Sequence, residues 1–131
     1  MPGAEFTSVL DASALMAHLN EEDGAAAVRE AMEVGAAISI ANWAEVLSNA
    51  AEAGEDPRRL ADDLRDAVIV EPIIEADCIE IAKLRPITKP QGLSLADRAC
   101  LVLAARLGVP ALTSDRVWAD ADVSAEVKLI R

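Results

Sequence analysis

The sequence has little of what zinc sites and disulfide-stapled folds require. Its 131 residues include a single histidine, His18, and two cysteines, Cys78 and Cys100, with no C-x-x-C spacing. This scarcity argues against a zinc site. Both cysteines lie in apolar, helix-like stretches and are predicted to be buried free thiols. The sequence also lacks a G-x-x-x-x-G-K-[ST] motif, which excludes a phosphate-cradling nucleotide hydrolase.

Long hydrophobic runs are missing as well. No apolar stretch approaches the ~20 residues of a membrane span, and residues 1–10 lack a basic segment followed by an apolar one. We therefore expect a cytoplasmic protein with no membrane partner. Hydrophobic residues nevertheless make up 53% of the chain, which predicts one globular domain over residues 1–131. A chain of this size buries roughly two thirds of its unfolded surface, enough for a core without disulfides.

Positive charge is scarce in the first half of the chain. Residues 1–56 hold 11 acidic side chains and one basic one, Arg29, whereas residues 57–131 hold 12 acidic and 11 basic side chains. The net charge is -11. Non-specific nucleic-acid binding needs clustered lysine and arginine to neutralise phosphates. Any role on nucleic acid is therefore expected to be local and assisted by a metal ion.

Apolar patterning and turn residues predict alternating strands and helices. Strands are expected at 6–10, 37–40, 68–70, 111–113 and 127–130, and helices at 13–19, 22–34, 42–53, 75–84 and 94–107, with a further helix starting at Asp56-Pro57. Gly35 is expected to end the second helix, and residues 86–92 are expected to form a loop after the helix that ends at Leu84. This order predicts an α/β fold around a mainly parallel sheet.

Four acidic residues follow predicted strands. Asp11 comes directly after the first strand, Glu45 in the first turn after the second, Asp97 at the start of the helix from Ser94, and Asp115 two residues after the fourth strand. Parallel strand ends meet at one edge of a sheet, where ligands bind. Clustered carboxylates repel by roughly 1 to 4 kcal/mol per pair at about 4 Å, so they attract a cation. Oxygen donors alone suit Mg²⁺ or Mn²⁺, which predicts metal-assisted hydrolysis of a phosphodiester.

Each of these acids also has a purely structural interpretation. Asp11 could cap the following helix, and Asp97 has capping-box spacing from Ser94. Glu45 has the same spacing from Asn42 and could belong to a solvated helix face. Asp115 could form an ordinary turn. Convergence of the four acids is therefore the prediction that separates a functional site from local capping.

Taken together, the acidic segments resemble the PIN-domain ribonucleases, and within them the VapC-type toxins of toxin-antitoxin pairs. The resemblance extends over nearly the whole chain and depends on the order and separation of four segments: Val9-Leu10-Asp11-Ala12-Ser13-Ala14-Leu15, Asn42-Trp43-Ala44-Glu45-Val46, Leu93-Ser94-Leu95-Ala96-Asp97-Arg98-Ala99 and Leu112-Thr113-Ser114-Asp115-Arg116-Val117-Trp118.

The resemblance implies a three-layer α/β/α sandwich and an Mg²⁺- or Mn²⁺-dependent endoribonuclease that cleaves tRNA, rRNA or mRNA and inhibits translation. The acidic metal-site positions of the family fall on Asp11, Glu45, Asp97 and Asp115. Asp11, Asp97 and Asp115 would hold the metal, and Glu45 would position or deprotonate water. Ser13 and Thr113 match small hydroxyl residues that support the site. Asp120 is an optional further acid.

The resemblance also implies a cognate protein antitoxin and a homodimer. The acidic first half of the chain would attract a basic segment, and an apolar groove for it could consist of Leu15, Met16, Leu19, Val28 and Met32, which could equally be core residues. RNA phosphates could contact Arg58, Arg59, Lys83, Arg85, Lys89, Arg98 and Arg116, with Lys89 and Arg116 placed in loops. Phe6, Trp43 and Trp118 are expected in the core.

Two other functions remain open from the sequence. A phosphoacceptor receiver domain has a similar size and an acidic Mg²⁺ pocket, but Asp11 lacks an acidic neighbour and Lys89 follows a helix rather than a strand. A catalytically inactive PIN-like module that binds RNA or a partner would retain the fold without cleaving. Metal binding and the effect of Asp97→Asn on cleavage would distinguish this module from the enzyme.

Overall fold

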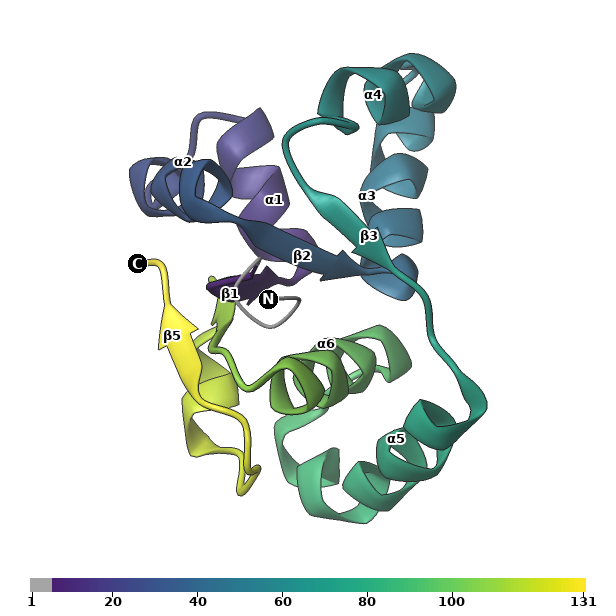
Figure 1. The fold of residues 1–131 in the computed structure, drawn as a ribbon, viewed down its shortest axis with the longest axis vertical. Coiled ribbons are helices and arrows are strands. Elements are labelled where there is room, and N and C mark those ends of the chain that lie inside the picture. The colour runs from purple at the N-terminus through teal and green to yellow at the C-terminus, as the bar shows by residue number, and fades with distance from the viewer. Residues whose placement is uncertain (1–5) are drawn as a thin grey trace.

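The computed structural model describes residues 6–131, which form a parallel sheet with helices on both faces (Figure 1). The strands are β1 (Ser8–Leu10), β2 (Ala36–Ser39), β3 (Ile69–Glu71), β4 (Ala111–Thr113) and β5 (Val127–Leu129), in the spatial order β3-β2-β1-β4-β5. The helices are α1 (Ala12–Leu19), α2 (Ala25–Val34), α3 (Ile40–Glu52), α4 (Pro57–Leu64), α5 (Glu75–Thr88) and α6 (Leu95–Leu107). Short 3-10 helices span Lys89–Gln91 and Arg116–Asp120.

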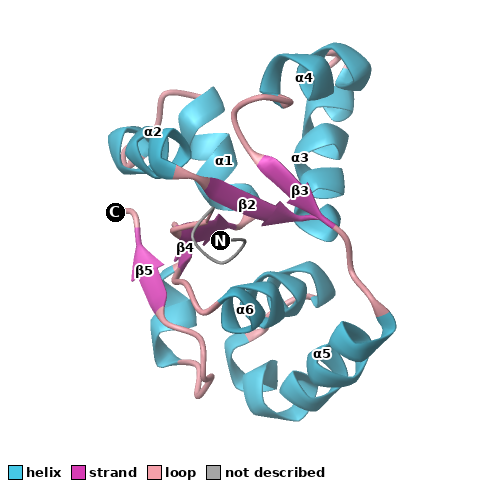
Figure 2. Cartoon of the chain, in the orientation of Figure 1, coloured by secondary structure: helices cyan, strands magenta, loops and turns pink. Residues whose placement is uncertain are grey.

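Side chains of the central strands alternate between two buried faces. Leu10, Ile38 and Leu112 pack into one core cluster with residues of α1, α2 and α3. Their neighbours Val9, Ala37 and Ala111 pack into a second cluster with residues of α6. Figure 2 shows helices on either side of the sheet, and parallel sheets covered on both faces have strands that are apolar throughout. The predicted three-layer α/β/α sandwich is confirmed.

The sheet is parallel throughout, which places the carboxyl ends of its strands at one edge. β1 pairs with β2 and with β4, and β3 and β5 extend the sheet on its two sides. α6, which precedes β4 in the chain, is fixed against the sheet because residues 98–104 of this helix are buried. No helix in the part of the chain that the structure describes is long and apolar enough to cross a membrane.

Three predicted helix boundaries are wrong by two residues or more. α2 begins at Ala25 instead of residue 22. α5 continues through Pro86 to Thr88 instead of ending at Leu84, so residues 86–88 are not a loop and Lys89 lies in a 3-10 helix. A proline in the last turn removes only one backbone hydrogen bond, and the Thr88 hydroxyl donates to the Leu84 carbonyl at 2.7 Å. α3 begins at Ile40 because the Ser39 hydroxyl accepts the Ala41 N–H, which places Glu45 in the second turn.

Three predictions about apolar residues have different outcomes. The groove of five apolar residues is wrong: Leu15 and Val28 are fully buried, and Met16, Leu19 and Met32 pack against the same core. The aromatic prediction is confirmed, since Trp118 is buried and Phe6 and Trp43 pack against the core clusters. Cys100 is buried as expected, but Cys78 of α5 is exposed.

Gly24, the residue before α2, is expected to tolerate substitution poorly. Its φ is +96°, and an added Cβ would lie 2.7 Å from the Ile130 carbonyl oxygen. Gly24→Ala is therefore expected to lower the free energy of unfolding by roughly 2 to 4 kcal/mol, through left-handed strain plus a backbone clash. Gly54→Ala is the matched control, because its φ is +86° and nothing lies within 4 Å. Equal losses in urea melts of the two variants would contradict the clash.

Candidate functional site

Asp11 is held at the carboxyl end of β1 by hydrogen bonds from the next residues in the chain and from the end of β4. It is 3% exposed and is the N-cap of α1. Its Oδ1 accepts the Ala14 N–H at 2.8 Å and the Ser13 hydroxyl at 2.7 Å. Its Oδ2 accepts the Thr113 hydroxyl, at the end of β4, at 2.6 Å. The predicted contacts of Ser13 and Thr113 with this carboxylate are therefore present, together with the capping contact.

The two hydroxyls extend this network to the segment after β4. The Ser13 hydroxyl accepts the Ser114 N–H at 3.0 Å, and the Thr113 hydroxyl accepts the Asp115 N–H at 3.0 Å. The two hydroxyl oxygens lie 3.3 Å apart. Because the residues are about 100 positions apart in sequence, this network fixes the end of β4 and the start of the segment carrying Asp115 relative to Asp11.

Burial makes Asp11 an unusual carboxylate. Desolvation raises its pKa from 3.8 to about 6, against the lowering effects of the Thr113, Ser13 and Ala14 hydrogen bonds. The negative charge of Asp97 raises the pKa further. A carboxylate accepts about four hydrogen bonds, and three are made here. One acceptor position on Oδ2 is thus left for a further donor or a cation.

Asp97 both caps a helix and acts electrostatically on the other acids. Its Oδ2 accepts the Ser94 N–H at 2.9 Å, and the Ser94 hydroxyl accepts the Asp97 N–H at 3.1 Å. The capping-box interpretation of this pair is confirmed. The charge of Asp97 also raises the pKa of Glu45 and of Asp11, so the starts of α1, α3 and α6 converge.

Glu45 is the most exposed of the three acids that interact electrostatically, and its side chain is held by Asn42, a residue that was not predicted to belong to the site. The side chain is exposed, and partial burial is the largest cause of its raised pKa. Asn42, which is fully buried, donates its amide to Glu45 Oε1 at 3.0 Å. The predicted capping box of Asn42 is wrong, since Ser39 caps α3. The sequence offered one signal for Asn42: it is a polar residue on the helix face that also carries the apolar residues Val46 and Ala50.

The four predicted acids are not brought together equally. Burial raises the pKa of the Cys100 thiol well above 9.0, and the charges of Asp11, Asp97 and Glu45 raise it further. The charges of these three acids therefore all act on one buried group of α6. Asp115 is exposed, and its Oδ1 accepts the Val117 N–H at the start of a 3-10 helix. Its link to Asp11 is the backbone contact through Thr113.

The donors suit a hard divalent cation, although they are not gathered into a closed cage. Within residues 6–131 no three histidine, cysteine, aspartate or glutamate side chains lie close enough to hold a metal ion. The available donors are carboxylate oxygens, which Mg²⁺ and Mn²⁺ prefer. Mg²⁺ commonly binds through one or two carboxylates and keeps several waters, so it does not need a preformed cluster of three. The donor chemistry at Asp11, Asp97 and Glu45 fits such an ion.

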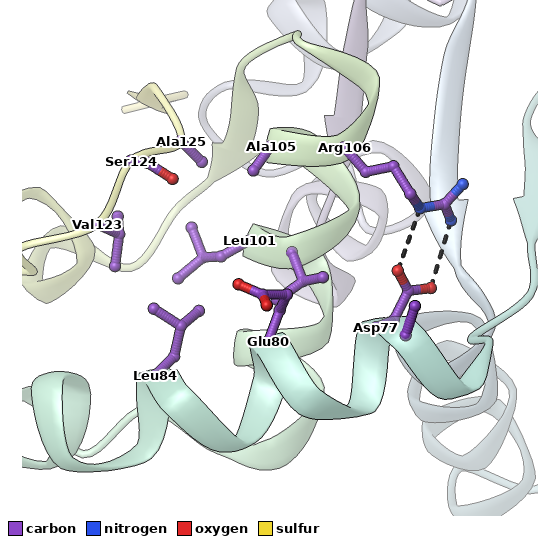
Figure 3. A pocket seen from close by; sticks show the side chains of 11 residues that line it. Asp77, Glu80, Leu84, Leu101, Ala105, Arg106, Val123, Ser124 and Ala125 are labelled. Carbon is purple, nitrogen blue, oxygen red and sulfur yellow. Dashed lines mark hydrogen bonds and ion pairs between the residues drawn. The ribbon is translucent and has the colours of Figure 1, made fainter.

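A separate cavity lies away from these acids. It has a volume of about 420 Å³ between α5, α6 and the segment before β5, with Leu84, Leu101 and Val123 among its lining residues (Figure 3). Asp77 and Arg106 form an ion pair at its side, with Nε and Oδ1 3.2 Å apart. Asp77 also accepts the Ile74 N–H and so stabilises the start of α5. This cavity contains none of the four predicted acids and is not the candidate site.

Comparison with known proteins defines the class of this fold. The chain matches the PIN domain family over residues 8–124 and belongs to that family. The predicted resemblance to PIN domains is therefore confirmed. PIN domains are generally nucleases that use divalent metal ions, so family membership supports hydrolysis of nucleic acid. No curated protein matches the sequence significantly.

Solved structures with this fold include several toxin-antitoxin complexes. The DNA-bound VapBC from Salmonella typhimurium matches with a TM-score of 0.74 and 14% identity, over 96% of this chain and 99% of that chain. VapBC2 from Rickettsia felis, bound to a promoter DNA fragment, matches with a TM-score of 0.73 and 12% identity, over 93% and 97%. VapBC-5 from Mycobacterium tuberculosis matches with a TM-score of 0.62 and 23% identity, over 95% and 98%. The likeness to VapC-type PIN toxins is thus confirmed for the fold.

Proposed function

We propose that this protein is a metal-dependent endoribonuclease that acts as the toxin of a toxin-antitoxin pair and inhibits translation by cleaving RNA. The observation that carries the proposal is the buried Asp11 carboxylate, held by Ser13 and Thr113 where the charge of Asp97 reaches it. PIN-family membership supports nuclease chemistry, and the similar folds of VapBC toxin-antitoxin proteins support the toxin role. Translation takes place in the cytoplasm, so a cytoplasmic localisation belongs to the proposal.

In this proposal Asp11, Asp97 and Asp115 hold Mg²⁺ or Mn²⁺, and Glu45 orients or deprotonates the attacking water. The bound ion would supply Lewis-acid stabilisation of the charge that develops on the phosphodiester. Ser13 and Thr113 keep the Asp11 carboxylate in one orientation. The raised pKa of Glu45 favours its role as a proton acceptor near neutral pH.

The substrate and partners follow from the same proposal. RNA phosphates, of tRNA, rRNA or mRNA, would contact exposed basic residues such as Arg58, Arg59, Lys89 and Arg116. Arg98 does not belong to this set, because it is buried. A cognate antitoxin and a second copy of the chain would cover exposed apolar side chains, among them Val34, Ile40, Ile69, Ile74 and Leu95. Neither partner would bind in the predicted groove, because the residues of that groove belong to the core.

A second candidate function is a PIN-like module that binds RNA or a partner without cleaving. The absence of three gathered metal-binding side chains in the described chain favours this alternative. It shares the fold and the partner surfaces with the enzyme, and it differs in having no saturable divalent-metal site.

Calorimetric titration with Mn²⁺ at neutral pH is the experiment that separates these functions. The wild type is expected to bind saturably, and Asp97→Asn to bind at least about 10-fold more weakly. Asparagine keeps an oxygen for the Ser94 N–H, so the start of α6 stays intact, whereas Asp97→Ala removes the cap and is expected to lower the unfolding free energy by about 0.5 to 2 kcal/mol. Equal Mn²⁺ affinity of wild type and Asp97→Asn, or no binding by either, would overturn the proposed metal site.

A further inference from the structure

Arg98 is a buried cation without an acidic partner. It is 9% exposed and lies at the end of the first turn of α6. Its Nη1 donates to the Ile81 carbonyl of α5 at 2.9 Å, and its buried Nε has no hydrogen-bond partner among residues 6–131. Burying an unpaired charge is unfavourable, because the lost hydration is not replaced. The guanidinium is therefore a group that an anion would stabilise.

The contrast with the other basic residues strengthens this point. The five ion pairs found in the described part of the chain involve Arg29, Arg65, Lys83, Arg106 and Arg131, whose side chains are all 37% or more exposed. Acidic residues outnumber basic ones by 23 to 12 in this sequence. The most buried arginine nevertheless lacks a carboxylate in a chain that has carboxylates in excess.

Arg98 lines a small pocket whose other walls are largely apolar. The pocket has a volume of about 300 Å³ and lies between the start of α3, the segment before α5, and the packed helices α5 and α6. Its lining residues are Ala41, Ile73, Cys78, Ile81, Ala82, Leu95, Arg98 and Ala99. A pocket of this size holds a small ligand, and apolar walls with one polar anchor fix the orientation of an amphipathic one.

We propose that this pocket binds a small aliphatic carboxylate, with its carboxylate on the Arg98 guanidinium and its hydrocarbon chain against Ile73, Ile81 and Leu95. A carboxylate matches the planar guanidinium fork and carries one charge, equal to the single charge of Arg98. Inorganic phosphate carries more charge and more oxygens than one arginine in an apolar pocket satisfies. The ligand therefore needs both an acidic head and an apolar tail.

The site is distinct from the proposed nuclease centre and goes beyond the proposed function. Arg98 directly follows Asp97 in the sequence, but the Asp97 carboxylate is bonded to the Ser94 N–H. The proposal stands whether or not the protein cleaves RNA, since it depends on the burial and partners of Arg98 and on a pocket that none of the four predicted acids lines.

Cys78 supplies a direct reporter of occupancy. It lines the pocket and is exposed, whereas the chain's other cysteine, Cys100, is buried. Sodium hexanoate is expected to slow the alkylation of Cys78 by iodoacetamide several-fold in the wild-type protein. Mass spectrometry of the intact protein measures the alkylation. Hexanoate is also expected to raise the melting temperature of the protein. Hexan-1-ol, which lacks the charge, and inorganic phosphate, which lacks the tail, are expected to give little protection.

Arg98→Met tests the anchor, and Arg85→Gln is its control. Methionine fills a similar volume without a buried charge, so the variant is expected to fold. Hexanoate should bind it roughly 10- to 100-fold more weakly, the loss expected for a charge-assisted hydrogen bond. Arg85 is an exposed residue of α5, and its replacement should leave hexanoate protection unchanged.

A second variant guards against a failure of Arg98→Met to fold. Ala82→Leu fills the pocket from an exposed helical position and should abolish protection with Arg98 intact. The proposal is overturned if hexanoate fails to protect Cys78 in the wild type, if phosphate or hexan-1-ol protects equally well, or if both pocket variants keep wild-type protection.

Discussion

Asp11→Asn is expected to lower RNA cleavage by at least about 100-fold while making the metal-free protein more stable at neutral pH. Activity falls because an amide is a much weaker ligand for Mg²⁺ or Mn²⁺ than a carboxylate, and Asp11 is the most buried of the proposed ligands. Stability rises because the charge that burial destabilises is removed. A loss of function combined with a gain of stability cannot be explained by unfolding.

In Asp11→Asn, every group that now bonds to the Asp11 carboxylate can keep a hydrogen-bond partner. The asparagine Oδ1 can accept from the Ser13 hydroxyl and the Ala14 N–H, as the carboxylate does. Its amide can donate to the Thr113 oxygen, whose hydroxyl hydrogen can turn toward the Ser13 oxygen 3.3 Å away. The Asp115 N–H keeps its bond to Thr113. The substitution therefore changes the charge and leaves the geometry intact.

Cleavage of a total RNA preparation in Mn²⁺ buffer, compared with urea melts in chelator, measures the two effects. Asp56→Asn is the matched control, because Asp56 caps α4 with its carboxylate on the Arg58 N–H and is not a predicted site residue. It should leave cleavage unchanged. Full activity in Asp11→Asn would contradict the proposed role of Asp11, and a large loss of stability would contradict the account of its burial.

Local chemistry in the sequence predicted most of the architecture. Short apolar runs bounded by turn residues made the strands recognisable, and β1, β2 and β4 are buried throughout. The caps at Asp56 and Ser94 lie where they were expected. Such features depend on neighbours within a few residues. Gly35 ends α2 with a φ of +118°, as a helix-terminating glycine should.

Features that depend on distant partners were predicted less well. Pro86 was expected to stop a helix, but the Thr88 hydroxyl bonds to the carbonyl of Leu84 and the helix continues. Asn42 became a site candidate only through its contact with Glu45, and the exposure of Cys78 depends on which side of α5 faces α6. Arg98 was named among the possible RNA contacts, but it is buried. Tertiary packing decided each of these.

The candidate site illustrates the same division. The positions of Asp11, Asp97 and Asp115 after strands or at a helix start follow from sequence, and the effect of the Asp97 charge on Asp11 and Glu45 agrees with their predicted convergence. The bond from Thr113 to Asp11 spans 102 positions and was suggested by family resemblance rather than by local pattern. Metal binding by these residues stays a prediction.

The stability of the metal-free protein is expected to fall as pH rises from about 4 to about 7. The pKa of Asp11 is 3.8 in an ordinary environment and about 6 in the folded protein. Below the lower value both states are protonated, and the native state carries no buried charge. Between the two values the unfolded chain ionises first, so stability is lost until pH exceeds the folded pKa. The displacement corresponds to roughly 3 kcal/mol of unfolding free energy.

Other groups titrate in or near this window and oppose or add to the trend. Burial and Arg29 lower the pKa of His18, and the Arg131 hydrogen bond lowers that of Glu22; both contributions are lost as pH falls. The raised pKa of Glu45 acts in the same direction as that of Asp11. All three groups are present in Asp11→Asn. The difference between wild type and this variant therefore isolates Asp11.

Urea melts in chelator at several pH values between 4 and 8 measure this difference. The two unfolding free energies should be similar near pH 4 and diverge through pH 6, with the variant more stable by roughly 3 kcal/mol at pH 7.5. Curves that stay parallel over this range would show that Asp11 titrates normally. Mn²⁺ should narrow the gap at pH 7.5, because a cation at the site favours the ionised carboxylate that burial disfavours. One titration thus connects the energetic penalty at Asp11 to the ion that the proposed nuclease requires.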